Sequence, residues 1–455
     1  MRIGIVGAGI SGLATAFWLQ RARPDWQLVI FESAGGPGGA LHTEEIAGFR
    51  FEAGCNGFLT NKPDSLDLVR AAGADPLLME SSALARKRFL YTDALHLMPE
   101  SPRAFIATPL LTGRGKLRVL AELLVPRRRD GADETLEEFG RRRLGREFTD
   151  VFLDAMTAGI YASTPARLSV AAAFPLIVAL EREHGGLFRG MLARRRREAG
   201  PGGVLMSFRG GVSTFIEHLR HLVHAEYRFD SRVVAVGRAG PRYAIHTDGA
   251  GLEVDRVILA TPAHVTAGLV AGLDAAFAAR LARIEYSPVA VVGFGYRALA
   301  HPLDGFGLLT TAAARQPVLG ILWDGSVFPD RVPPGGKILR AMLGGQRNPE
   351  LALLPDPDLI TLARAGIRGT LGIDADPDVV FVRRWERGIP NYGPGHLANV
   401  AAIDAAAAAL PGLDLTGNAY HGVAMNDCCR ASRQLAARIV GDAETRTAAP
   451  GRSGN

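Results

Sequence analysis

Cysteine is scarce in this 455-residue chain, and the three that occur exclude two structural classes. Cys428 and Cys429 are adjacent, Cys55 stands alone, and no Cys-x-x-Cys spacing is present. A disulfide framework or a zinc cage would need more cysteines at regular spacings. We therefore expect a protein of a reducing compartment that holds no metal.

Long apolar runs are missing as well. The longest mostly apolar stretch, residues 168–180, has thirteen residues and contains Pro175, whereas a membrane-spanning helix needs roughly 18. Apolar residues 3–6 are expected to form a strand, which leaves no room for a signal peptide before it. These absences predict a cytoplasmic protein without a membrane anchor.

Common catalytic signatures are absent too. The chain contains no His-Glu-x-x-His, no Gly-x-Ser-x-Gly and no lysine-bearing phosphate loop. His218, His221 and His224 recur at every third residue, in a helix-like stretch without a metal-ligand set. We expect these histidines to be surface or packing residues.

The net charge of +6 is unevenly distributed. Residues 86–200 hold 21 Lys/Arg and 14 Asp/Glu, including consecutive arginines at 127–129, 141–143 and 194–197. Such clusters suit anionic lipid or an acidic small molecule, although a solvated helical face has the same composition. Nucleic acid is not expected, because aromatic residues do not alternate with the arginines as a stacking platform requires.

The start of the chain carries the strongest motif. Apolar residues 3–6 run into Gly-Ala-Gly-Ile-Ser-Gly at residues 7–12, and an amphipathic segment follows. This order predicts a strand, a tight glycine turn and a helix. Gly7 allows the turn, Gly9 lets the backbone approach a pyrophosphate, and Gly12 lets the helix pack on the strand. The helix N-terminus then offers free N–H groups to the phosphates.

Two further elements favour FAD as the dinucleotide. A second strand, residues 27–31, ends at Glu32, where a carboxylate can accept hydrogen bonds from ribose hydroxyls. Gly38 and Gly39 follow and let the backbone lie along a long dinucleotide. Near the C-terminus, residues 417–429 open a helix whose N–H groups suit the pyrimidine edge of a flavin. A ligand-free glycine turn and an ordinary helix cap are the alternatives.

The order of the segments predicts a discontinuous architecture that combines α/β and α+β folds. Residues 1–85, 204–265 and 383–442 are expected to form one Rossmann-like FAD-binding domain. Residues 86–203 form a basic helical insertion, and residues 266–382 form a mixed-sheet substrate domain. Residues 443–455 are expected to be a disordered tail.

Taken in order along nearly the whole chain, the motifs resemble those of the FAD-dependent, oxygen-using protoporphyrinogen oxidases within the wider flavin amine oxidase group. Position 40 departs from that wider group, because it is alanine where many amine oxidases carry arginine after the paired glycines. Besides residues 7–12, 32–33 and 38–39, the resemblance rests on residues 51–54, 87–91, 157–162, 168–169, 305–309, 320–324, 328–329, 342–345, 384–385, 389–392, 395–396 and 422–428.

The resemblance implies a set of cofactor contacts that includes the glycines and the C-terminal element already described. No side chain stands out as a general base, so no catalytic residue is predicted. The expected FAD contacts are Gly7, Ala8, Gly9, Ile10, Ser11, Gly12, Glu32, Ser33, Gly38, Gly39, Ala40, Gly54, Cys55, Asn56, Gly57, Val234, Trp385, Gly417, Asn418, Val423, Ala424 and Met425.

The resemblance also implies a substrate site. Arg88 matches an arginine that pairs with a porphyrinogen propionate, and Phe306, Leu309 and Met342 match apolar residues that sandwich the macrocycle. Gly159 is a further expected substrate contact. Without the resemblance, Arg88 would be taken for a solvated charge at a strand start and the three apolar residues for core.

The implied function is oxidation of protoporphyrinogen IX to protoporphyrin IX in heme biosynthesis, with dioxygen as acceptor. The alternatives are a coproporphyrinogen III oxidase, an amine oxidase or desaturase, and a non-catalytic binding protein on the same scaffold. Amine oxidation usually relies on an aromatic cage and a lysine, and Tyr420 is the one candidate for such a cage. The expected partners are the porphyrinogen, dioxygen, peripheral contact with anionic lipid at the inner face of the cell membrane, and a second copy in a homodimer.

Overall fold

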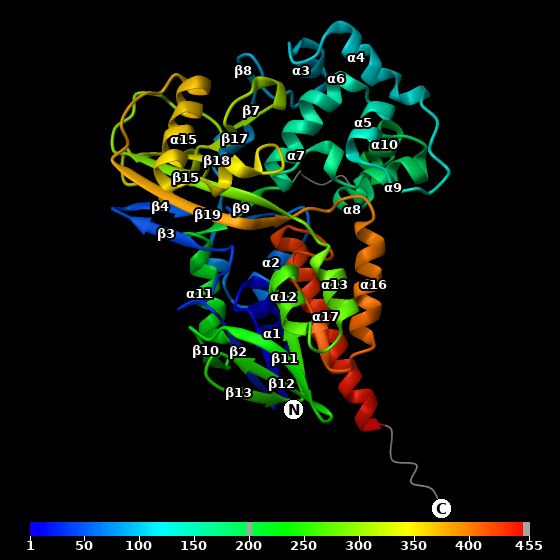
Figure 1. The fold of residues 1–455 in the computed structure, drawn as a ribbon. Coiled ribbons are helices and arrows are strands. Elements are labelled where there is room, and N and C mark those ends of the chain that lie inside the picture. Colours follow the sequence, from blue (N-terminus) through cyan, green and yellow to red (C-terminus); the bar gives the residue numbers. More distant parts are fainter. Residues whose placement is uncertain (198–202, 449–455) are drawn as a thin grey trace, which may run out of the picture.

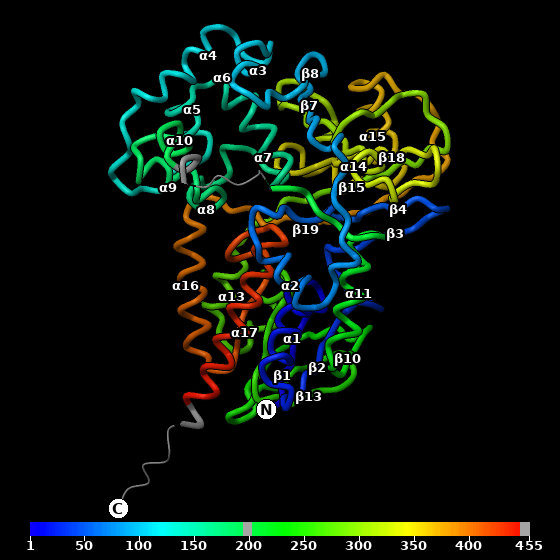
Figure 2. Tube along the Cα trace, turned by 180° about the vertical axis from the view of Figure 1, so that it is seen from behind, coloured from blue at the N-terminus to red at the C-terminus, as the bar shows by residue number. Residues whose placement is uncertain are grey.

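The computed structural model describes residues 1–197 and 203–448, which divide among three units (Figure 1). A nucleotide unit lies at the bottom of the view and includes both ends of the described chain. A mixed-sheet unit and a helical unit lie side by side above it. In both views α16 (His396–Ala408) forms the outer edge of the nucleotide unit, beneath the helical unit (Figure 2).

The nucleotide unit is built on a parallel five-stranded sheet. Its strand order is β10 (Glu226–Arg228), β2 (Gln27–Phe31), β1 (Arg2–Val6), β14 (Arg256–Leu259) and β20 (Leu413–Leu415). β2 and β10 lie on one side of β1, and β14 and β20 lie on the other, so the strand order reverses between β1 and β14. In such sheets a ligand binds beyond the carboxyl ends of the strands where the order reverses.

These strands are almost wholly apolar because both faces of the sheet are covered. Ile3 and Ile5 point into one core, whereas Val29 and Phe31 point into the other. The first core is covered by α1 (Ile10–Ala22), α2 (Asp64–Ala71), α11 (Val212–Leu222) and α17 (Met425–Ala448). The second is covered by α12 (Ala263–Val270), α13 (Ala275–Ala282), α16 and a small sheet of β11 (Val233–Ala239), β12 (Arg242–Thr247) and β13 (Gly251–Val254).

The mixed-sheet unit contains seven strands, which are antiparallel apart from the parallel pair of β16 (Gly307–Thr310) and β7 (Arg88–Tyr91). A hairpin of β3 (Thr43–Ile46) and β4 (Phe49–Glu52) lies below this sheet in Figure 1. The seven strands, in order, are β19 (Val379–Pro390), β15 (Tyr286–Tyr296), β18 (Lys337–Gly344), β17 (Val318–Leu322), β16 (Gly307–Thr310), β7 (Arg88–Tyr91) and β8 (Leu95–Leu97).

The two faces of this sheet have different neighbours. Leu308, Ile321 and Ala341 pack beneath α15 (Asp356–Leu371). The opposite face meets the β3–β4 hairpin, where the Phe51 ring packs so closely on Gly293 that an added Cβ would lie 2.4 Å from it. The face opposite α15 therefore looks toward the nucleotide unit.

The helical unit is held by an apolar core and by a buried cluster of ion pairs. Its helices are α3 (Pro102–Ala107), α4 (Gly113–Leu120), α5 (Leu136–Arg143), α6 (Arg146–Phe148), α7 (Asp154–Tyr161), α8 (Val170–Ala173), α9 (Pro175–His184) and α10 (Leu187–Arg197), with a π-helical segment at Thr149–Leu153 before α7. Short elements elsewhere are β5 (Phe58–Leu59), β6 (Leu78–Glu80), β9 (Leu205–Phe208), α14 (Asp324–Val327) and several 3-10 turns.

The arginines at 141–143 do not form the surface cluster that their sequence suggests. Arg143 is fully buried and pairs with Glu122 and Glu181, and Arg142 pairs with Glu134 and Glu181. Buried charges require such partners, because an unpaired ion in the interior is very costly. The side chains of the run at 194–197 lie outside the part of the chain that the structure describes.

The fold class expected from the sequence is confirmed, but four local expectations are wrong. The interval 86–203 opens with β7 and β8, which extend the mixed sheet and are not helical. The expected boundary at 383 falls inside β19. The helical spacing of apolar residues over 136–152 predicts one continuous helix, but that helix is broken at Gly145, which has a φ of +93°. Helix α17 continues to Ala448, because Val440 and Ala443 still pack on the nucleotide core; residues 449–455 lie outside the described residues.

Across the described ranges, no helix has both the length and the hydropathy needed to cross a membrane.

Candidate functional site

The glycine turn between β1 and α1 lies at the point where the strand order reverses. Gly7 has a φ of +105°, and an added Cβ on Gly12 would lie 2.0 Å from the Gly7 carbonyl oxygen. Both positions therefore require glycine. Gly9 differs, because an added Cβ there would meet only the Gly38 carbonyl oxygen, at 3.8 Å. The outer side of Gly9 is open to a ligand.

The Glu32 carboxylate is fixed beside this turn by three donors. One oxygen, Oε2, accepts the Ala8 N–H at 3.0 Å. The other, Oε1, accepts the Ala34 N–H at 3.0 Å and the Ser33 hydroxyl at 3.2 Å. A carboxylate accepts several hydrogen bonds at once, so Glu32 keeps capacity for ribose hydroxyls.

A cavity of about 1120 Å³ extends from Glu32, past the glycine turn, to the start of α17. Its walls come from the nucleotide unit and from β19. Of the cofactor contacts expected from the sequence, the lining contains Gly7, Gly9, Ile10, Ser11, Glu32, Ser33, Gly38, Gly39, Ala40, Cys55, Gly57, Trp385, Gly417, Asn418, Val423, Ala424 and Met425.

The remaining expected cofactor contacts lie outside this lining. Gly12 is packed into the turn, and the Ala8 N–H points to Glu32. Gly54 and Asn56 belong to the polar network described below. Val233 lines the cavity in place of Val234, whose side chain is 46% exposed.

The start of α17 is held at the cavity by Tyr392. Its hydroxyl donates to the Asn418 carbonyl oxygen at 2.6 Å and accepts the Gly422 N–H at 2.9 Å. Burial raises the pKa of Tyr392, so the hydroxyl keeps its proton and can donate. The helix N-terminus, with its free N–H groups, is thereby aimed at the cavity.

Arg340 of β18 connects the mixed sheet to the cofactor loop at residues 52–57. The guanidinium is buried, donates to the Glu52 and Gly54 carbonyl oxygens at 2.9 and 3.2 Å, and also bonds the Asn56 side-chain oxygen. Asp324 neutralises the arginine at 2.6 Å and accepts the Asn56 amide at 3.1 Å. The backbone of the loop is therefore fixed by a side chain from the other unit.

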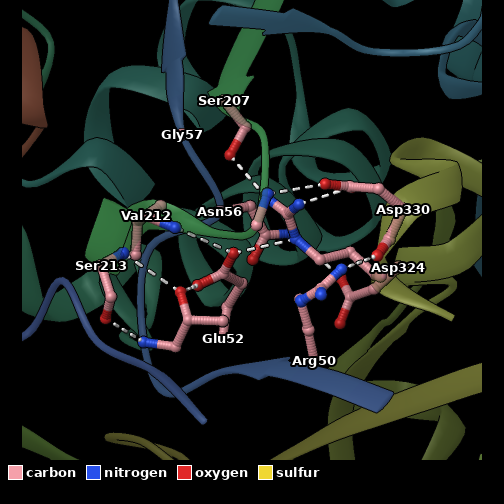
Figure 3. A network of polar contacts seen from close by, with 12 residues as sticks. Arg50, Glu52, Asn56, Gly57, Ser207, Val212, Ser213, Asp324 and Asp330 are labelled. Carbon is pink, nitrogen blue, oxygen red and sulfur yellow. Dashed lines mark hydrogen bonds and ion pairs between the residues drawn. The ribbon is translucent and has the colours of Figure 1, made fainter. Parts of the chain in front are cut away.

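Glu52 forms a second buried pair beside the first (Figure 3). Arg331 donates to its carboxylate at 3.0 Å and to the Ser207 hydroxyl at 2.8 Å. Thr43 donates to the other carboxylate oxygen at 2.7 Å. Burial raises the pKa of Glu52, and Arg331 opposes that rise.

The expected substrate residues lie apart from this cavity lining, on the face of the mixed sheet opposite α15. Leu309 lies opposite Gly320, and Gly320 lies opposite Met342. Paired residues of neighbouring strands project to the same face. Arg88 lies opposite Gly307, two residues before Leu309, and therefore shares this face.

Arg88 and Phe306 form a contact at the β7 side of this face. The Arg88 guanidinium carbon lies 5.2 Å from the centre of the Phe306 ring, and Arg88 is exposed. Gly159 of α7 packs against Leu309 from the helical unit, since an added Cβ would lie 2.9 Å from a Leu309 methyl carbon. The structure thus brings four expected residues (Arg88, Gly159, Phe306 and Leu309) together in contacting pairs and places Met342 on the same face.

Sequence reasoning missed several cavity residues, among them Lys62, His264, Tyr286, Arg384 and Arg387. A signal existed for one of them. Residues 257–262 have the apolar pattern of a buried strand that returns to the cofactor sheet, and His264 lies two residues after them. The others have no local motif. Tyr420, the candidate for an aromatic cage, is 3% exposed in the nucleotide core and is not part of the cavity lining.

The cavity fits FAD. Along its length lie a carboxylate that can bind a ribose, an open glycine turn that can bind a pyrophosphate, and a helix N-terminus that suits a flavin pyrimidine ring. The fold and the site define an FAD-binding oxidoreductase.

Known proteins identify the family. The model of the flavin containing amine oxidoreductases matches residues 10–440, and the chain belongs to that family. Protoporphyrinogen oxidase of Bos taurus is 32% identical over 481 residues, covering 96% of this chain and 98% of the relative. Coproporphyrinogen III oxidase of Bacillus subtilis (strain 168) is 27% identical over 447 residues, covering 93% and 94%.

A solved structure agrees with these sequence relatives. The crystal structure of a protein from Exiguobacterium sp. 255-15 superimposes with a TM-score of 0.86 at 27% identity. It covers 97% of this chain and 99% of that one. The resemblance, the enzyme class and the cofactor expected from the sequence are confirmed.

Replacing Gly9 by valine is expected to give a folded protein without flavin. The protein side of Gly9 leaves room for a Cβ, while the added methyl groups enter the cavity. We expect a melting temperature equal to that of the wild-type apoprotein and no bound flavin in the visible spectrum. Gly36→Val is the control, because a Cβ at Gly36 meets nothing within 4 Å and Gly36 lies outside the cavity lining. A yellow, fully loaded Gly9→Val protein would contradict this placement.

Proposed function

We propose that the protein oxidises protoporphyrinogen IX to protoporphyrin IX, with dioxygen as the final acceptor. Six hydrogen atoms leave the macrocycle in three two-electron steps, and three dioxygen molecules become three hydrogen peroxide molecules. Bound FAD supplies the two-electron acceptor for each step. The chain supplies binding, orientation and exclusion of water.

The sheet face that carries Arg88, Leu309 and Met342 is the observation on which this proposal depends. Leu309 and Met342 offer apolar contact to a flat tetrapyrrole, and Arg88 offers an exposed guanidinium for a carboxylate. Within the described ranges, the Arg88 side chain forms no ion pair or hydrogen bond. Its guanidinium lies over the Phe306 ring in a cation–π contact. Arg88 is therefore available to a ligand.

The relatives support a porphyrinogen as the substrate class, since proteins named protoporphyrinogen oxidase and coproporphyrinogen III oxidase both match nearly the whole chain. The two porphyrinogens differ in their side chains, and coproporphyrinogen III carries more carboxylates. The purified holoenzyme is therefore assayed with both, by porphyrin fluorescence and oxygen uptake. We expect a higher kcat/KM with protoporphyrinogen IX. A preference for coproporphyrinogen III would overturn the choice of substrate, and inertness toward both would overturn the function.

Arg88→Ala is expected to raise KM for the porphyrinogen about ten-fold, because a charge-assisted hydrogen bond to the substrate carboxylate is lost. Flavin content stays at the wild-type level, since Arg88 lies outside the cofactor cavity. Arg86→Ala is the matched control, because Arg86 is an exposed arginine two residues away in a 3-10 turn. Equal kinetics of Arg88→Ala and wild type would remove Arg88 from the substrate site.

We also propose that the helical unit contacts an anionic membrane. Ile106, Leu117 and Leu124 are large apolar side chains with 71%, 68% and 84% exposure in or next to α3 and α4. Arg103 and Arg114 on the same two helices are exposed as well. Exposed apolar side chains among cations are typical of a surface that enters the lipid headgroup region.

Sedimentation with liposomes tests this contact. We expect binding to vesicles that contain phosphatidylglycerol, weaker binding to neutral vesicles, and a decrease as salt is added. Ile106→Glu with Leu124→Glu lowers binding, whereas Leu353→Glu, at an exposed leucine of the mixed-sheet unit, leaves it unchanged. Binding that ignores lipid charge, salt and these substitutions would refute the proposal.

A further inference from the structure

Among the residues that the structure describes, four lysine or arginine side chains line the FAD cavity, and two of them are already paired. Lys62 bonds Asp427 at 2.9 Å, and Arg384 bonds Asp356 at 2.6 Å. Arg232 and Arg387 are exposed, and neither guanidinium forms an ion pair or hydrogen bond within the described ranges. Unpaired cations in a ligand cavity suit a ligand with negative charge.

The two unpaired arginines border different parts of the cavity. Arg232 follows Ser231, whose N–H donates to the Glu32 carbonyl oxygen at 2.8 Å, so Arg232 lies at the ribose end. Arg387 lies on β19 three residues before Pro390, which pairs with Tyr286 of β15. Burial lowers the pKa of His264 and the charge of Arg387 adds to that effect, whereas burial raises the pKa of Tyr286 and Arg387 opposes the rise. The two rings contact each other edge to face, 4.9 Å between centres. Because its neighbours are His264 and Tyr286, Arg387 lies near the start of α12.

The start of α12 adjoins the glycine turn. Ala260 and Thr261 come between β14 and α12, and an added Cβ on Gly7 would lie 3.1 Å from the Ala260 carbonyl oxygen and 3.6 Å from the Thr261 methyl carbon. His264 follows three residues later and also lines the cavity. The segment that begins α12 therefore borders the middle of the cavity, where Gly9 leaves room for a ligand. Arg387 lies near this same segment.

The glycine turn has no cation of its own. Residues 7–12 and 35–41 contain neither lysine nor arginine, and position 40, after the paired glycines, is alanine. Backbone N–H groups and the dipole of α1 favour an anion there, but they do not neutralise a full charge. A pyrophosphate diester carries two negative charges.

We propose that Arg387 donates from β19 to the FAD pyrophosphate and supplies the charge that the glycine turn lacks. Burial and the charge of Arg387 lower the pKa of His264, which leaves Arg387 as the cationic group in this part of the cavity. The Nδ1 atom of His264 is buried without a partner among the described residues. This assignment rests on FAD binding, which the family and the cavity establish, and does not depend on the identity of the porphyrinogen.

The test measures ligand binding by the apoprotein, without substrate. Wild type, Arg387→Ala, Arg387→Lys and the control Arg297→Ala are titrated with FAD, and in parallel with ADP and with riboflavin. ADP contains the pyrophosphate without the flavin, and riboflavin contains the flavin without phosphate. Arg297 is an exposed arginine of the mixed-sheet unit outside the cavity lining.

Arg387→Ala is expected to raise the Kd for FAD and for ADP about ten-fold or more, the usual effect of losing a charge-assisted hydrogen bond. Riboflavin binding stays unchanged, lysine restores part of the affinity, and the Kd for FAD depends less on salt in Arg387→Ala than in wild type. Equal FAD affinity in wild type and Arg387→Ala overturns the proposal. A loss shared by riboflavin also overturns it, because the contact would then be to the flavin ring.

Discussion

The buried guanidinium of Arg340 holds the two halves of the site together. The arginine belongs to a central strand of the mixed sheet, yet its hydrogen bonds go to the carbonyl oxygens of Glu52 and Gly54 in the cofactor loop. Asp324 neutralises it from the same unit. Removing either member of a buried pair leaves an uncompensated charge, which costs about 3–5 kcal/mol. The loop that lines the FAD cavity therefore has one position relative to the sheet.

Because of that constraint, the two faces of the mixed sheet have different roles. One face is sealed by α15 with ordinary apolar packing. The other face packs on the β3–β4 hairpin and on α7, and the cofactor loop that Arg340 holds lies next to it. Trp385 adds a second connection, since its indole N–H donates to the Ala53 carbonyl oxygen at 2.8 Å. The apolar residues that remain on this face are the ones proposed for the substrate.

The motifs of the nucleotide unit could be predicted from the sequence because each depends on interactions among residues that are close together in the chain. The turn at residues 7–12 needs a positive φ at Gly7 and a missing side chain at Gly12, and both requirements are visible as glycines. The strand at 27–31 and the carboxylate at Glu32 follow from apolar patterning and spacing. The apolar stretches at 289–296, 318–323 and 338–343 likewise predict strands, and β15, β17 and β18 occur close to these positions.

Contacts between distant segments could not be read in the same way. The run at 141–143 has the composition of a surface patch, but Arg143 is buried because Glu122 and Glu181 reach it from other helices. β7 was hidden in a helical region because its partner, β16, lies more than two hundred residues later in the chain.

The sequence by itself therefore determined the cofactor fold, through glycines and apolar periodicity that act over a few residues. Only the tertiary structure decided which charges are paired and which remain free. Arg384 and Arg387 are three residues apart on one strand, yet the first is bonded to Asp356 and the second has no partner among the described residues. Ion pairing depends on which side chains meet in space, and spacing along the chain does not encode it.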